Sequence, residues 1–217
     1  MNFRLTVIVI ITLVFGTVVM AHPIPDIPVR AFFYGSGKAR IEVEIDPRCF
    51  LEDPNEELYM LYWYFQRCDE AEKQKMIDDA IAFVPTRLKF AFESSQGVRK
   101  PKYEVDFTTH DGRPLEKLDD PVVMRLVWET VLPKTAKTYQ IQTKKVGILS
   151  VIPLNHVNNE AVEKVQVLFP GEDSYVLDLP ERLSEEEIRS IMTKPLIFGV
   201  GLLIAFIFLR TFRRFSK

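Results

Sequence analysis

Apolar and polar positions alternate in short runs through the middle of this chain, a pattern typical of β-strands. Residues 39–46, ARIEVEID, place Ile41, Val43 and Ile45 on one side and mostly charged residues on the other. The glycine-containing residues 35–38 join this run to 29–34, so the two runs predict a hairpin. Further strands are expected at 88–93, 102–108, 122–131, 138–143, 147–154, 162–169 and 175–179. This succession predicts a mainly β fold, an antiparallel sandwich of immunoglobulin-like type.

One helical segment, 54–84, interrupts the strands. Asp53 is a suitable N-cap, Pro54 suits the first helical position and Glu56 completes a capping box. From Leu58 onward, apolar residues recur at a spacing of three and four residues, as on one face of a helix. We therefore expect an inserted helical segment within a domain that spans 22–183.

The first half of this insertion carries aromatic residues on more than one helical face. Tyr59, Trp63 and Tyr64 lie outside the main apolar stripe. Two interpretations remain open. These side chains are packed in the core, or they form a surface that binds a partner.

The N-terminus has the pattern of a signal peptide over residues 1–21. Arg4 precedes an apolar run at 5–19, and small residues end at Ala21, so cleavage would leave His22 as the mature N-terminus. The alternative is an uncleaved signal anchor. Either way, the domain that follows is exported.

The C-terminus predicts a membrane anchor. A juxtamembrane helix is expected at 184–194, a transmembrane helix at 195–212 and a short basic tail at 213–217. The uncharged core of the anchor, 196–209, spans only about 21 Å as a helix, so its flanks must help it cross, and we expect it to pack on another membrane span. The residues that define it are Leu196, Phe198, Gly199, Gly201, Phe206 and Leu209. We expect a single-pass cell-membrane protein with a periplasmic or extracellular domain and a cytoplasmic C-terminus.

Charge separates the domain from its tail. Residues 26–189 hold all 30 acidic residues and 22 of the 28 basic ones, a net charge of −8. Such a domain repels nucleic acid and anionic lipid. The predicted partners are therefore the bilayer, through the C-terminal helix, and another membrane protein.

The two cysteines, Cys49 and Cys68, both lie in the exported part. A pair in an oxidising compartment favours a disulfide over two thiols, and the spacing matches no redox or zinc motif.

The histidines are the candidate metal ligands: His22, His110 and His156. An N-terminal histidine on a β-sandwich resembles the copper-binding CopC-type proteins and the lytic polysaccharide monooxygenases, although Pro23 departs from them. The resemblance implies a copper-type ion, with Asp26 or Asp111 as the nearest oxygen ligand.

No catalytic motif is visible, which favours a protein that is not an enzyme. The function predicted first is a membrane-anchored extracytoplasmic binding or accessory protein of a bacterial envelope complex. The alternatives are a copper-type metal-binding domain that uses His22 and an envelope hydrolase.

Overall fold

The predicted hairpin forms and lies at the centre of a larger sheet. The computed structural model describes residues 25–54 and 58–182. Strand β1 (Ile27–Phe33) pairs antiparallel with β2 (Lys38–Ile45), and Val29 lies opposite Val43. The turn between the strands contains Gly37 at a φ of 84°, a left-handed conformation that glycine adopts without strain.

The larger sheet contains six strands in the order β4-β5-β2-β1-β7-β8. The four strands added to the hairpin are β4 (Glu104–Thr108), β5 (Val123–Val131), β7 (Val151–Val157) and β8 (Glu160–Ala161). The pairing of β1 with β7 is parallel, so the prediction of a purely antiparallel sheet is wrong there. After β5 the chain reverses into the second sheet and reverses again before β7, and two reversals make β7 run in the direction of β1.

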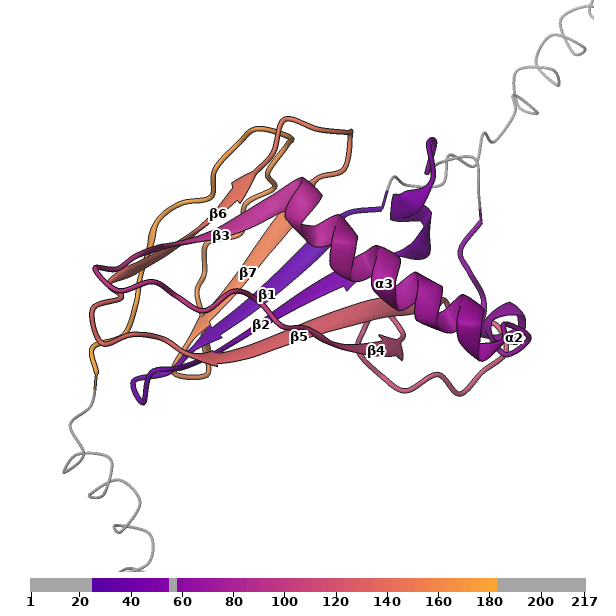
Figure 1. Cartoon of the computed structure of the whole chain (residues 1–217), viewed down its shortest axis with the longest axis horizontal. Helices are drawn as coiled ribbons and strands as arrows, with labels where there is room; N and C mark the ends of the chain where they lie inside the picture. The colour runs from indigo at the N-terminus through magenta and orange to yellow at the C-terminus, as the bar shows by residue number, and fades with distance from the viewer. Residues whose placement is uncertain (1–24, 55–57, 183–217) are drawn as a thin grey trace, which may run out of the picture.

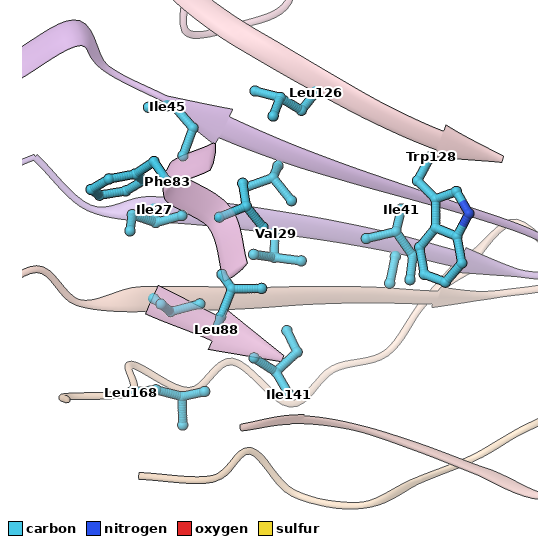
Figure 2. Close-up of a cluster of buried hydrophobic side chains, with 14 of the residues drawn as sticks. Ile27, Val29, Ile41, Ile45, Phe83, Leu88, Leu126, Trp128, Ile141 and Leu168 are labelled. Carbon is cyan, nitrogen blue, oxygen red and sulfur yellow. The ribbon is translucent and has the colours of Figure 1, made fainter. Parts of the chain in front are cut away.

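A three-stranded sheet packs against the larger one. It has the order β3-β6-β9, with β3 (Leu88–Glu93), β6 (Thr138–Thr143) and β9 (Leu177–Asp178). Inward side chains such as Ile41, Leu126 and Ile141 meet between the sheets and are fully buried (Figure 2). A mainly β fold with two sheets is therefore confirmed. Burial of these apolar side chains is the main source of its stability.

Helix α3 (Glu70–Arg87) covers part of the same core (Figure 1). Asp69 caps it, because its carboxylate accepts the Glu72 N–H at 2.8 Å and the Glu72 carboxylate accepts the Asp69 N–H at 2.8 Å. The first half of α3 is largely exposed, whereas the buried residues of the helix, Ala80, Phe83 and Val84, all lie in its second half. The helix is thus attached to the sheets mainly by its C-terminal half.

The prediction that the helix continues from Pro54 is wrong in its first half. Residues 58–60 carry no regular structure, and Leu61 forms a β-bridge with Pro121. The Val122 N–H also donates to the Met60 carbonyl at 2.8 Å. These backbone bonds hold the segment against the start of β5. Between β2 and β3, the helices of the described residues are the 3-10 helix η1 (Pro47–Phe50), the four-residue α2 (Tyr62–Phe65) and α3.

The strand expected at 162–169 is also wrong. Only Leu168 in this segment pairs, as an isolated bridge to Val151, and the exposed fractions of Val165 and Phe169 are 72% and 59%. The signal peptide, the juxtamembrane helix and the anchor residues 196–209 lie outside the described residues. Within 25–54 and 58–182, no helix has the length and apolar character required to cross a bilayer.

Candidate interaction surface and histidine sites

Trp63 and Tyr64 lie on the surface at one end of the larger sheet. Their exposed fractions are 42% and 52%, and their rings are 5.9 Å apart. The Trp63 N–H donates to the carbonyl of Leu118 at 3.0 Å, and the Leu118 side chain is 61% exposed. We call Trp63, Tyr64 and Leu118 the aromatic surface. Exposed apolar groups at one place on a protein are characteristic of a binding site.

The aromatic surface is attached to the sheet by the residues that flank it. Phe65 is buried, and its ring packs on that of Phe107 in β4 at 4.5 Å. The guanidinium of Arg67 lies 5.0 Å from the Trp63 ring centre, a cation–π contact that limits the motion of the indole. Trp63 is therefore exposed yet positioned.

Tyr59, which the sequence grouped with Trp63 and Tyr64, has a different environment. The guanidinium of Arg48 lies 3.7 Å from the Tyr59 ring centre, and the Tyr59 ring meets that of His110 edge-on at 5.7 Å. The half-buried Tyr59 side chain thus belongs to a cluster with Arg48 and His110 and not to the aromatic surface.

Arg48 and Asp46 form a buried ion pair beneath Tyr59. The Arg48 Nη2 donates to Asp46 Oδ2 at 2.8 Å, and the two side chains are only 3% and 2% exposed. Burial lowers the pKa of Arg48, but the hydrogen bonds and charge of Asp46 outweigh it and the pKa is raised overall. Arg48 is therefore a permanent cation that holds Tyr59 in place.

His110 lies beside the same cluster. Its Nδ1 is 2.8 Å from Glu44 Oε1, and Glu44 also accepts a hydrogen bond from Arg30 at 2.9 Å. A hollow of about 280 Å³ is lined here by Pro25, Asp26, Pro28, Glu44, Asp46, Arg48, Tyr59, His110 and Ile152. The start of the described chain thus lies next to His110.

His156 is elsewhere on the sheet. Its ring stacks on Phe32 at 4.6 Å, whereas the hollow beside His110 is next to Pro28. Phe32 and Pro28 are four residues apart on β1, or about 13 Å at the rise of a strand. The structure therefore separates His156 from His110, and His22 lies outside the described residues. In the part of the chain that is described, no three histidine, cysteine, aspartate or glutamate side chains are grouped to hold a metal ion.

The predicted disulfide is wrong, because Cys49 and Cys68 are free thiols. Cys49 lies in η1, which packs on the end of α3 through Phe50 and Phe83 at 5.4 Å, whereas Cys68 precedes the helix N-cap. About 20 Å of helix thus separates the two positions, and a disulfide requires Cα atoms within about 7 Å. Burial raises the pKa of the Cys49 thiol to about 12, so it stays protonated.

A basic groove between α3 and the sheets was missed by the sequence analysis. Its lining includes Lys89, Arg99 and Lys144, which come from β3, the β3–β4 connection and the segment after β6. Arg99 belongs to a short basic run at 99–102, but Lys89 and Lys144 are distant from it in the chain, so the sequence does not show that these residues share a groove. Neither a protein-family model nor a curated protein matches this chain.

Proposed function

We propose that this protein is a membrane-anchored, extracytoplasmic binding or accessory subunit of a bacterial envelope complex, and that the aromatic surface contacts its protein partner. The signal peptide at 1–21 and the transmembrane helix at 195–212 are parts of this proposal. So is the immunoglobulin-like classification of the sandwich, from which the parallel β1–β7 pair departs.

The observation that supports this function is the distance between the aromatic surface and Arg182, the last described residue of the chain. At the far end of β5, Arg182 donates to the carbonyls of Ser36, Leu132 and Pro133. The Arg182 guanidinium lies so close to Gly37 that a side chain at Gly37 would collide with it. The described chain therefore ends against the β1–β2 turn. Val122 and Leu132, the residues on either side of β5, are ten positions apart, or about 33 Å at the rise of a strand. The two sites lie at opposite ends of the molecule (Figure 1).

This separation favours a protein partner over the bilayer. If residues 195–212 anchor the chain, the aromatic surface lies about 30 Å from the point at which the chain turns toward the membrane. With β5 pointing away from the bilayer, as this proposal has it, Trp and Tyr side chains at such a distance do not reach the headgroup region. They are also the residue types that contribute most to binding at protein interfaces.

The test is a double variant, Trp63→Ala with Tyr64→Ala, in the full chain purified from membranes. We expect the variant to migrate alone on native gels and wild type to migrate in a larger particle. The matched control, Val165→Ala with Phe169→Ala, removes exposed apolar groups elsewhere and is expected to keep the larger particle. A loss of more than about 2 kcal/mol in the double variant's free energy of unfolding would mean that these side chains are core, which contradicts the proposal.

We infer a second candidate function, copper-type metal binding, from the hollow beside His110. Glu44 and His110 supply two donors there, and a third must come from outside the described residues. His22 precedes Pro25 by three residues, which span at most about 11 Å, so it is within reach of the hollow. Imidazole nitrogens suit copper, zinc and nickel.

Copper titration of the processed protein tests this second function. Loss of Cu(II) affinity is expected in His22→Ala and in His110→Ala. His156→Ala is the matched control, because His156 lies about 13 Å away along the sheet, and it is expected to bind as wild type does. Equal affinity in all four proteins would contradict the site.

A further inference from the structure

Two adjoining hollows form a continuous groove along one side of the molecule. The first has a volume of about 820 Å³ and the second about 980 Å³. Both are lined by Arg99, Lys100, Lys102 and Trp128. The connection between β3 and β4, which carries the three basic residues, passes across the front of the molecule below α3 (Figure 1). It forms one wall of the groove.

Aromatic and aliphatic side chains line the first hollow. Phe90 and Phe92 of β3 meet Trp128 of β5, with ring centres 6.0 and 6.3 Å apart. Ile81 of α3, whose side chain is 37% exposed, lines the same hollow. The volume lies within the range of about 300–1,000 Å³ typical of pockets that bury one small molecule. An apolar chain is therefore the component of a ligand that this hollow accommodates.

Positive charge is concentrated around the apolar lining. Lys89, Arg99, Lys100, Lys102 and Lys144 all line the first hollow, and no acidic side chain does. The second hollow has one acidic residue, Glu129, whose carboxylate lies 3.6 Å from the Arg40 guanidinium. Within the described residues, none of these five forms a salt bridge, although acidic residues outnumber basic ones there by 25 to 21. Five unpaired cations at one apolar hollow attract an anion. The net charge of the domain conceals this local field.

We propose that the groove binds a single-chain amphiphile with one anionic head group, such as a long-chain carboxylate. Its apolar chain packs against Phe90, Phe92 and Trp128, and its head group lies among the basic side chains of residues 99–102. An inorganic anion leaves the apolar lining unused, and a neutral hydrocarbon leaves the cations unused.

The groove is separate from the aromatic surface, and this inference stands whether or not a protein docks there. Its second hollow includes Lys38 and Val131, which pair with each other at the end of β5 where Arg182 fixes the chain exit. An anchored chain would therefore hold this end of the groove near the bilayer. The ligand reaches it as a free amphiphile, and a diacyl lipid taken from the bilayer is the alternative that the experiment distinguishes.

The experiment uses the full chain in nanodiscs of zwitterionic phospholipid. The chain has two tryptophans, so Trp63→Phe leaves Trp128 as the only one and its fluorescence reports on the groove. A hexadecanoate brominated in mid-chain is titrated, because bromine quenches indole fluorescence at contact distance. We expect saturable quenching by the carboxylate and about tenfold weaker binding of the corresponding neutral amide. No quenching by the carboxylate, or equal affinity for carboxylate and amide, overturns the proposal.

A matched pair of variants locates the head group. The triple variant Arg99→Gln, Lys100→Gln and Lys102→Gln is expected to bind the carboxylate about tenfold more weakly and to bind the amide unchanged. The control Lys117→Gln, Lys134→Gln and Lys137→Gln makes the same charge change at exposed lysines that do not line the groove, and it is expected to bind within twofold of wild type. Equal losses in the two variants would overturn the head-group site. Quenching by a brominated diacyl phospholipid in the nanodisc, without added carboxylate, would overturn the single-chain ligand.

Discussion

The two tryptophans of this chain have similar sequence surroundings and opposite environments. Trp63 lies in the aromatic run YMLYWYF and is 42% exposed, whereas Trp128 lies in the apolar run VVMRLVW and is 3% exposed. Trp128 belongs to a nine-residue strand that is covered by β3 on its inner face. Trp63 belongs to a four-residue helix that has one buried side chain, that of Phe65, which packs on Phe107 of β4.

The difference shows that the strands and layers packed around an element decide which of its aromatic residues are buried, more than the composition of the element does. A strand in the middle of a sheet has neighbours on both edges and a layer above it, so its inward side chains are enclosed. A short helix at the end of a sheet buries one side chain per turn and leaves the others in water. Local apolar content alone therefore does not distinguish a core aromatic residue from a binding residue.

The largest effect is expected for Trp128→Ala. Removing a ring that packs on Phe90 and Phe92 leaves a cavity, and we expect a loss of about 4 kcal/mol in the free energy of unfolding. Trp63→Ala removes a half-exposed ring and is expected to cost less than about 1 kcal/mol. Urea unfolding followed by far-ultraviolet circular dichroism measures both. Similar losses in the free energy of unfolding of the two variants would contradict the claim that Trp128 is core and Trp63 is not.

A smaller effect, about 3 kcal/mol, is expected for Asp46→Asn, because the substitution leaves the buried Arg48 cation without its counter-charge. Arg48 also holds Tyr59, so the same variant loosens the segment that leads to Trp63. Urea unfolding gives the stability, and the emission maximum of Trp63 in a Trp128→Phe background reports the local change.

The matched control for this pair is Asp106→Asn. Asp106 accepts a hydrogen bond from Arg125 at 3.3 Å, but its side chain is 61% exposed, so the expected loss is only about 0.5 kcal/mol. Equal losses in the free energy of unfolding would mean that the Asp46–Arg48 pair stabilises the protein no more than a surface ion pair does. The pair would then not hold the segment that leads from Tyr59 to Trp63.

Strands with regular alternation and clear turns could be predicted closely from the sequence. Residues 88–93 and 138–143 form strands with the predicted bounds, because polar and apolar side chains alternate between breakers at both ends. The start of the helix could not be predicted, since Asp53 and Asp69 both precede a glutamate by three residues. The bonds from Leu61 and Met60 to the start of β5 decide between them, and these are tertiary contacts.

The candidate sites were only partly predictable for the same reason. The sequence left open whether these aromatic residues are core or form a binding surface. The exposure of Trp63 and Tyr64 fits a binding surface, whereas Tyr59 packs against Arg48. The groove could not be predicted, although the basic run at 99–102 is visible in the sequence. Lys89 and Lys144 are separated by 55 positions and meet only when β3 pairs with β6. Charge counted along the chain gave a net negative domain and concealed a local concentration of cations.

The smallest effect concerns Asp111, the residue that follows His110. Hydrogen bonds from Arg113 and from the Thr109 hydroxyl lower the pKa of Asp111 from 3.8 to about 2. A carboxylate with a lowered pKa contributes stability that is present above pH 4 and is lost as the pH falls from about 4 to about 2. Asp111→Asn should therefore flatten the loss of stability in this interval, measured by thermal unfolding at each pH. The change should be slight, because the pair is exposed and screened by solvent. In an Arg113→Gln background the same substitution should have a smaller effect still, and an unchanged effect there would mean that Arg113 is not the main cause of the lowered pKa.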